Sequence, residues 1–93
     1  MRTIDWTNRF KRDYRRELKG RHGPELDVLL SDILPALQAD QPLAASLRDR
    51  ALTGDWRHHR DCHLRPDLVL IYAKPDDVTL RLVRLGSHSE LGL

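Results

Sequence analysis

The chain has 93 residues, enough for one domain, residues 1–93, with a single modest hydrophobic core. With 40% hydrophobic and 32% charged residues, it has the composition of a globular protein and not of a disordered one. No apolar run approaches the roughly 20 residues of a membrane span, and the N-terminus lacks the apolar segment of a secretory signal. Because one cysteine cannot form an internal disulfide, we expect a cytoplasmic protein.

The net charge is only +2, but the basic residues are unevenly distributed. Seven of the sixteen lie from Arg9 to Arg21, against only Asp13 and Glu17 in the same segment. Thirteen of the sixteen are arginine, the residue that binds phosphate groups bidentately and stacks on bases. The segment is therefore either a surface that contacts RNA or a solvated helix face without a partner.

The N-terminal part predicts a short edge strand over 3–6 and then a first helix. Thr7 or Asn8 can cap this helix, because their side-chain oxygens accept hydrogen bonds from the unpaired N–H groups at its start. The helix should end near Lys19. Apolar residues at helical spacing predict a narrow stripe that faces inward: Phe10, Tyr14 and Leu18.

A second helix is predicted from Pro24, which is tolerated in a first turn, to about Ala39. Its apolar face is broader than that of the first helix and consists of Leu26, Leu29, Leu30, Ile33, Leu34 and Leu37. Pro35 lies inside this pattern and should kink the helix or shorten it. Residues 40–50 should form an irregular connection.

Three strands are predicted near 56–64, 67–74 and 78–85, with a turn over 74–77. In the third strand, alternation predicts a buried face made of Val78, Leu80 and Leu82. Helices followed by consecutive strands predict an α+β fold. An N-terminal helical hairpin would pack on one face of a small antiparallel β-sheet.

The segment from Leu52 to Tyr72 holds three of the five histidines and the only cysteine. Alternation within the first predicted strand gives a buried side with Trp56, Cys62 and Leu64. The opposite, polar side would hold Arg57, His59, Asp61 and His63. Such a charged face on an apolar hairpin favours a binding or catalytic role.

The three strands would form a meander, so the first and third end at the same edge of the sheet. We therefore expect His63, Asp67, Arg84 and His88 to converge there, across two strand spacings of roughly 10 Å. Two histidines, a carboxylate and an arginine suffice for RNA cleavage without a metal. A base activates the 2′-hydroxyl, an acid protonates the leaving 5′-oxygen, and a cation stabilises the developing charge. Histidine suits both proton transfers because its ordinary pKa is about 6.5.

Other chemistries fit less well. On a strand, His59 and His63 would lie roughly 13 Å apart, too far for one metal ion. Cys62, on the buried side, is more typical of a small core residue than of a nucleophile. Each histidine taken alone can also be a bystander at a turn.

The pattern LxGxWxxxRDxHxxPDxxLIY over 52–72, followed by RxGSHxxL over 84–91, resembles the YafQ-type toxins of the RelE superfamily. These are toxins of type II toxin–antitoxin modules. The resemblance implies a RelE-like fold and a ribosome-dependent mRNA endonuclease that needs no metal or other cofactor. It also implies that a cognate antitoxin silences the activity, and that no membrane is involved.

Position by position, His63, Asp67 and His88 match the catalytic residues of that family. Asp61 and Arg84 match positions near its active site. We expect His88 to act as the general acid and either His63 or Asp67 to act at the 2′-hydroxyl.

Three departures from the family pattern concern the same site. Arg50 replaces a further histidine and is expected to help Arg84 hold the phosphate. Leu68 and Gly92 replace aromatic residues, which predicts weaker stacking of bases, an interaction worth about 1–3 kcal/mol per base.

Two other functions remain open. The first is a toxin of the same superfamily that acts by binding alone, as the gyrase-poisoning branch does; that branch lacks the paired histidines. The second is a non-toxic interaction domain. A neighbouring gene for a small DNA-binding protein with a disordered tail would favour either toxin over this last alternative.

Overall fold

The computed structural model describes residues 1–93 and contains one five-stranded sheet in the order β1-β5-β4-β3-β2. Its strands are β1 (Thr3–Trp6), β2 (Arg50–Ala51), β3 (Arg60–Arg65), β4 (Leu68–Ala73) and β5 (Thr79–Gly86). Its helices are α1 (Asn8–Leu18), α2 (Gly23–Gln38) and α3 (His88–Leu91), with short 3₁₀ turns η1 (Ala45–Leu47) and η2 (Gly54–Trp56). None of the helices combines the length and the apolar character that crossing a membrane requires.

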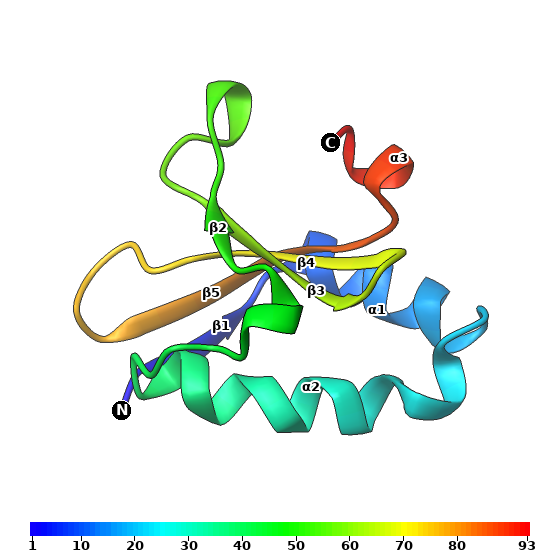
Figure 1. Cartoon of the computed structure of the whole chain (residues 1–93), viewed down its shortest axis with the longest axis horizontal. Coiled ribbons are helices and arrows are strands. Elements are labelled where there is room, and N and C mark those ends of the chain that lie inside the picture. Colours follow the sequence, from blue (N-terminus) through cyan, green and yellow to red (C-terminus); the bar gives the residue numbers. More distant parts are fainter.

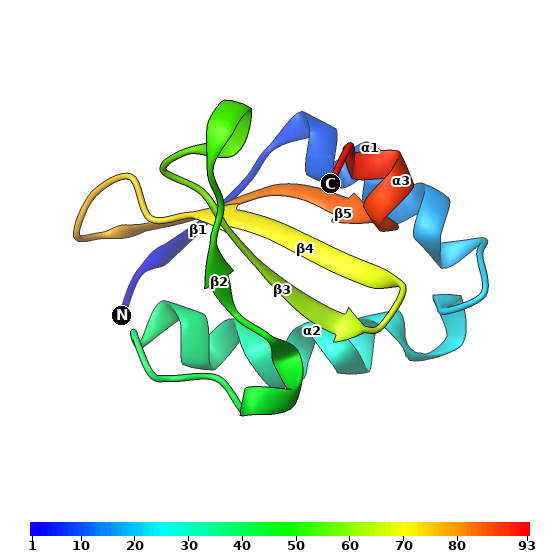
Figure 2. The same ribbon diagram turned by 45° about the horizontal axis from the view of Figure 1, so that its top comes forward.

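The predicted α+β class is confirmed, with the α1–α2 hairpin on one face of the sheet. Figure 1 shows α2 along that face, while α3 and the loop between β2 and β3 rise on the other side. The meander β3–β4–β5 is antiparallel, as predicted. The sheet as a whole is mixed, because β1 pairs in parallel with β5 at the edge (Figure 2). Both helices and the strands β2 to β4 lie between β1 and β5 along the chain.

Local signals set the ends of the helices. Thr7 caps α1, its hydroxyl oxygen accepting a hydrogen bond from the N–H of Phe10 at 3.2 Å. Pro24 lies in the first turn of α2, as expected. The helix continues through Pro35 to Gln38, close to the predicted end near Ala39, so of the two expected effects of Pro35, a kink or a shortening, the shortening does not occur. Leu34 and Leu37 flank the proline and are buried against the sheet, and this burial offsets the lost backbone hydrogen bond.

The core has two unequal parts because β4 is buried on both faces. The larger cluster fills the space between the helices and the sheet and includes Phe10, Leu26, Leu70 and Leu82. A smaller cluster lies on the opposite face and consists of Val69, Ile71, Val83 and Leu91, with Leu52 and Trp56 packed against it. This second face is covered only by short segments.

The first strand of the meander starts at Arg60, four residues later than predicted, because η2 interrupts the alternation. Trp56 therefore packs on the smaller cluster and not beside Cys62, as the alternation suggested. At the third strand, Val78 precedes β5 and is 66% exposed, so its predicted place on the buried face was also wrong.

The inward face of α1 contains a carboxylate that the apolar stripe did not predict. Leu18, expected inside, is 41% exposed, whereas Asp13 is only 3% exposed. Asp13 accepts hydrogen bonds from Arg84 Nε at 2.6 Å, from Arg16 Nη1 at 2.8 Å and from the N–H of Leu85 at 3.0 Å. Burial by itself would raise the pKa of Asp13, but the bonds from Arg84 and Leu85 outweigh it and hold the pKa below its usual value. This carboxylate therefore fixes α1 to β5.

We expect Asp13→Asn to lower the free energy of unfolding by about 2 kcal/mol, because it leaves buried donors without a charged acceptor. Since the pKa of Asp13 is lowered in the folded state, its contribution is present near neutrality and is lost as the pH falls below about 4. Urea unfolding of both proteins should therefore show a difference that shrinks in acid. Asp5→Asn, at an exposed pair with Arg81, should cost less than about 0.5 kcal/mol. Equal effects would contradict the role given to Asp13.

Candidate active site

The register of the sheet places the predicted site residues that lie on its strands on the more open face. One row across four strands is formed by Arg50, Asp61, Ile71 and Arg84. The next row is formed by His63, Val69 and Gly86. Residues paired in this way project to the same side, so side chains from β2, β3 and β5 share one surface. The sequence pattern correctly predicted that strands distant along the chain meet here.

The two predicted catalytic histidines meet directly. Just after β5, Ser87 caps α3: its hydroxyl accepts from the N–H of Glu90 at 3.2 Å, and the Glu90 carboxylate accepts from the N–H of Ser87 at 2.9 Å. This capping box turns the chain back over the sheet and brings His88 to β3. His63 Nε2 and His88 Nε2 are 3.0 Å apart, with ring centroids separated by 5.0 Å. A hydrogen bond between two such nitrogens holds one proton, so one ring accepts while the other donates.

The surroundings of His63 favour its neutral form. Burial lowers the pKa of His63, and the positive charge of Arg50 and Arg48 and the neighbouring His88 lower it further. The carboxylate of Asp61 acts in the opposite direction but does not reverse the shift. At neutral pH, His63 is therefore suited to accept a proton.

Arg50 and Asp61 form the next contact on this face. Arg50 Nε lies 3.2 Å from Asp61 Oδ1; the Asp61 side chain is completely buried, while that of Arg50 is 58% exposed. Asp61 Oδ2 and His63 Nδ1 are buried without a hydrogen-bond partner. Asp61 thus anchors an arginine whose guanidinium remains accessible to an anion.

Asp67 does not contact the histidine pair. Its carboxylate binds His22 Nε2 at 2.8 Å and Arg21 Nη1 at 3.2 Å, which ties the turn between β3 and β4 to the loop between α1 and α2. The hydrogen bond from His22 lowers the pKa of Asp67. The expected contact between Asp67 and the histidines is therefore replaced by ion pairing that sequence spacing could not predict.

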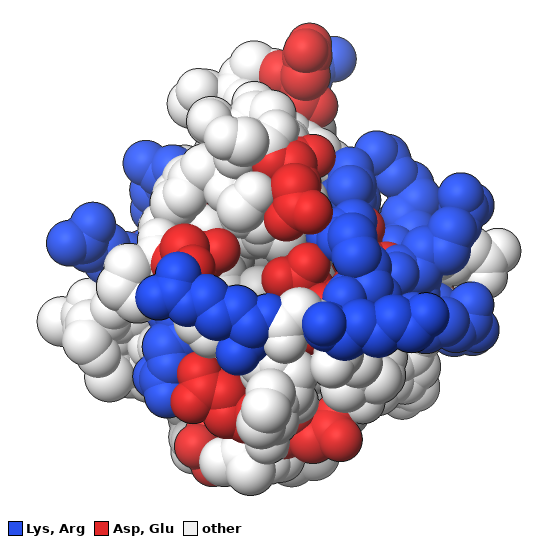
Figure 3. All heavy atoms as spheres, turned by 90° about the vertical axis from the view of Figure 1, so that its right-hand side faces the viewer, with Lys and Arg blue, Asp and Glu red and all other residues white.

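Arg84 lies on the predicted face, but it was expected to converge with the histidine pair, and its guanidinium is instead paired with Asp13. It borders a hollow of about 280 Å³ that is lined by Arg9, Arg12, Asp13, Arg16 and Arg84. Figure 3, which views the molecule from the right-hand side of Figure 1, shows Lys and Arg side chains gathered densely at the right of the view. The basic segment found in the sequence therefore adjoins the site.

Two residues near the site were missed by sequence reasoning. Arg48, in a left-handed backbone conformation within the irregular connection, shares a hollow of about 320 Å³ with His63. No pattern in the sequence marks it. Asp13 could have been found, because it lies three residues after Phe10 and one before Tyr14, on the inward side of the helix.

A family model of the bacterial YafQ toxins of type II toxin–antitoxin systems matches residues 2–92. The chain belongs to this family. The mRNA interferase toxin YafQ of Escherichia coli strain K12 is 33% identical over 90 residues, which cover 97% of this chain and 95% of that protein.

Solved structures of relatives extend this similarity to the fold. A copper-bound mutant toxin from Helicobacter pylori is 34% identical, with a TM-score of 0.86 over 98% of this chain and 99% of that one. The Escherichia coli DinJ–YafQ complex contains a chain that is 32% identical, with a TM-score of 0.79 over 98% of both chains. The chain described here contains no group of three or more His, Cys, Asp and Glu side chains that could hold a metal ion.

The environment of His63 predicts its titration. In NMR spectra recorded against pH, its imidazole should titrate below about 6.5, and His88→Asn should move the midpoint upward by removing a neighbouring charge and part of the burial. His58→Asn, in the exposed loop, should leave the midpoint unchanged. A midpoint of 6.5 or above in the unmodified protein would contradict this description of the pair.

Proposed function

We propose that this chain is the toxin of a type II toxin–antitoxin system and a ribosome-dependent endoribonuclease that cleaves mRNA in the cytoplasm. Membership of the YafQ family supports the toxin role, and the name of the Escherichia coli relative, an mRNA interferase, supports the reaction. The observation that carries the proposal is the direct contact between His63 and His88, a neutral base beside a candidate acid.

In the proposed reaction, His63 accepts the proton of the 2′-hydroxyl and His88 donates a proton to the leaving 5′-oxygen. The 2′-oxygen forms a bond to phosphorus as the bond from phosphorus to the 5′-oxygen breaks. RNA would have to separate the two rings to enter. After the products are released, the contact between His63 Nε2 and His88 Nε2 provides a direct path for the proton to return from His63 to His88.

Asp67 was an equal candidate for the base on sequence grounds. His63 is favoured, because Asp67 is paired with His22 and Arg21 and its pKa is lowered, which makes it a weaker base. We assign Asp67 instead to holding the β3–β4 turn, which begins three residues after His63.

The developing charge on the phosphate requires cations. Arg50 is exposed and oriented by buried Asp61, so we propose that it contacts the phosphate. Arg84 lies on the same face of the sheet, and its guanidinium, hydrogen-bonded to Asp13, borders the arginine-lined hollow. Both histidine chemistry and arginine charge are available here without a metal ion.

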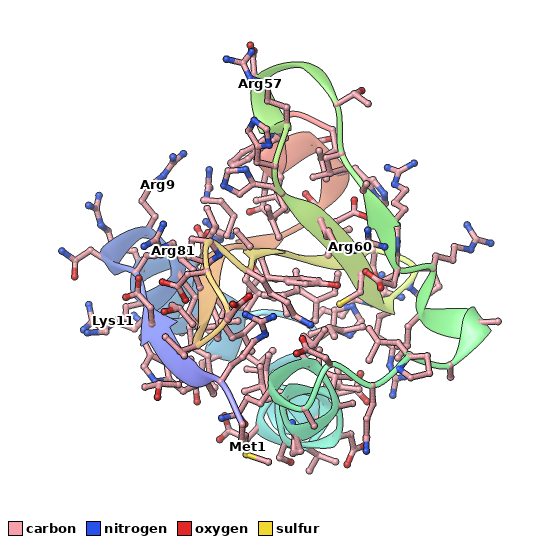
Figure 4. All side chains as sticks on the ribbon, turned by 90° about the vertical axis from the view of Figure 1, so that its left-hand side faces the viewer. Met1, Arg9, Lys11, Arg57, Arg60 and Arg81 are labelled. Carbon is pink, nitrogen blue, oxygen red and sulfur yellow. The ribbon has the colours of Figure 1, made fainter.

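The partners follow from the family and the surface. Relatives have been solved as DinJ–YafQ toxin–antitoxin complexes, and we propose a cognate antitoxin for this chain as well. Ribosomal RNA is the proposed partner of the arginine-lined hollow. Figure 4 shows Arg9 and Lys11 extending from α1 in different directions, so the helix presents two basic sides.

Replacing either histidine should abolish most of the cleavage. His63→Ala and His88→Ala should each slow cleavage of mRNA on translating ribosomes by about 10²–10⁴-fold, the usual value of a general acid–base step, while ribosome binding persists. Products should carry 2′,3′-cyclic phosphate and 5′-hydroxyl ends. EDTA should inhibit cleavage only by removing magnesium from the ribosome, and not by any effect on the chemical step.

His58→Ala, at an exposed loop position, is the matched control and should cleave normally. A 5′-phosphate product, or full activity of the double variant at His63 and His88, would refute the mechanism. Translation arrest without any cleavage would favour a toxin that acts by binding alone.

The arginine-lined hollow can be tested by charge reversal. Arg9→Glu with Arg12→Glu should weaken ribosome binding and flatten its salt dependence, because fewer counterions are released from RNA. Both arginines are exposed, and the ion pairs with Asp13 come from Arg16 and Arg84, so the fold should persist. Lys11→Glu with Arg15→Glu makes the same charge change on the side of α1 that lines the groove beside α2, and should have less effect. Equal losses would indicate only a general charge effect.

A further inference from the structure

A hollow of about 350 Å³ opens between the loop that joins β2 to β3 and the C-terminal end of α3. Figure 1 shows these two segments on the same side of the sheet. The side chains that give the hollow its chemistry come from both segments: Arg50, Leu52, Asp55, Trp56 and Leu93. Only Arg50 among them has a role in the reaction described above.

Hydrogen bonds link the walls of this hollow to the segments that carry the histidine pair. On one side, Arg50 is hydrogen-bonded to Asp61, two residues before His63 on β3. On the other, the N–H of Leu93 donates to the carbonyl oxygen of His88 at 2.9 Å. A ligand in the hollow therefore contacts Arg50 directly and the C-terminal turn whose backbone is hydrogen-bonded to His88.

Trp56 provides a flat surface for such a ligand. It is the only Phe, Tyr or Trp that packs against the smaller core cluster; the other four lie with the larger cluster or beside Phe10. The ring is partly exposed, and His59 contacts it nearly edge-on, with centroids 5.3 Å apart. Bases stack on aromatic side chains held in this way.

The turn that carries Trp56 also supplies a polar group. Gly54 has φ = 64°, a left-handed conformation that favours glycine, and the N–H of Trp56 donates to the carbonyl oxygen of Thr53 at 3.2 Å. Asp55 lies within this turn and is exposed at the rim of the hollow. Its carboxylate can only accept hydrogen bonds when ionised.

We propose that this hollow binds the nucleobase next to the scissile phosphate, stacked on Trp56 with its hydrogen-bonding edge toward Asp55. The proposal rests on the mRNA-cleaving function. Because the carboxylate accepts hydrogen bonds, it favours bases that carry an exocyclic amino group over uracil, whose single N3–H donor lies between two carbonyl oxygens. Arg50, at the same hollow, holds the adjoining phosphate.

The test uses translating ribosomes and mRNAs that differ only in the bases of the cleaved codon. Trp56→Leu keeps an apolar contact with the core but removes the flat surface, and should slow cleavage about 10-fold at every codon. Trp56→Phe should retain most of the rate. Asp55→Asn should reduce the preference for amino-bearing bases over uracil about 10-fold, because the new amide also donates.

Trp6→Leu is the matched control: the other tryptophan is 43% exposed but lies in the groove between α1 and α2, and its loss should change cleavage less than about twofold. If the unmodified chain cleaves while Trp56→Leu and Asp55→Asn keep its rate and base preference, the subsite is refuted and the reaction stands. If the unmodified chain fails to cleave, the function itself is refuted. Should thermal unfolding show that Trp56→Leu does not fold, the exposed Asp55→Asn decides alone.

Discussion

The burial of β4 on both faces is the constraint from which the site follows. All six residues of this central strand are buried, so each face of the sheet needs a cover. The two long helices cover one face, and the other is covered only by a 3₁₀ turn and the single turn of α3. Leu91 from α3 packs on the strand, and that contact positions His88 at the start of the same turn. The candidate acid is thus oriented by the core.

Charge pairing decides which polar groups remain available for chemistry. Three carboxylates near the site are each bound by an arginine: Asp13 by Arg84, Asp61 by Arg50 and Asp67 by Arg21. Hydrogen bonds lower the pKa of both Asp13 and Asp67, which makes these two carboxylates poor proton acceptors near neutral pH. The imidazole pair then remains as the group suited to proton transfer, and the carboxylates serve to place the arginines.

Much of the architecture could be predicted from local patterns. The cap at Thr7, the proline at the start of α2 and the meander of three strands all follow from rules that act over a few residues. Pairing between distant elements could not be predicted in the same way. The parallel contact of β1 with β5 depends on the whole chain folding back, and nothing in the spacing of residues encodes it.

The same distinction applies to the site. Meander geometry was enough to bring His63 and His88 to one edge, because strand order fixes which ends meet. It could not predict the partners of Asp67, since long side chains from the α1–α2 loop reach that carboxylate from outside the sheet. Likewise, Trp56 lies in a 3₁₀ turn that ends before β3 begins, so the alternation of the strand does not extend to it and its packing was wrongly predicted.

The departures from the family pattern are explained by the places these residues occupy. Leu68 is completely buried in the larger cluster, on the helix side of the sheet, so it contributes to packing and not to an RNA surface. Gly92 ends α3 with φ = 70°, a conformation in which an L side chain is strained. Neither position can supply a stacking surface beside the histidines in this chain. Trp56 packs on this face of the sheet and lines the hollow beside the C-terminal turn of α3. It is therefore the aromatic residue placed to contact a base in the proposed reaction.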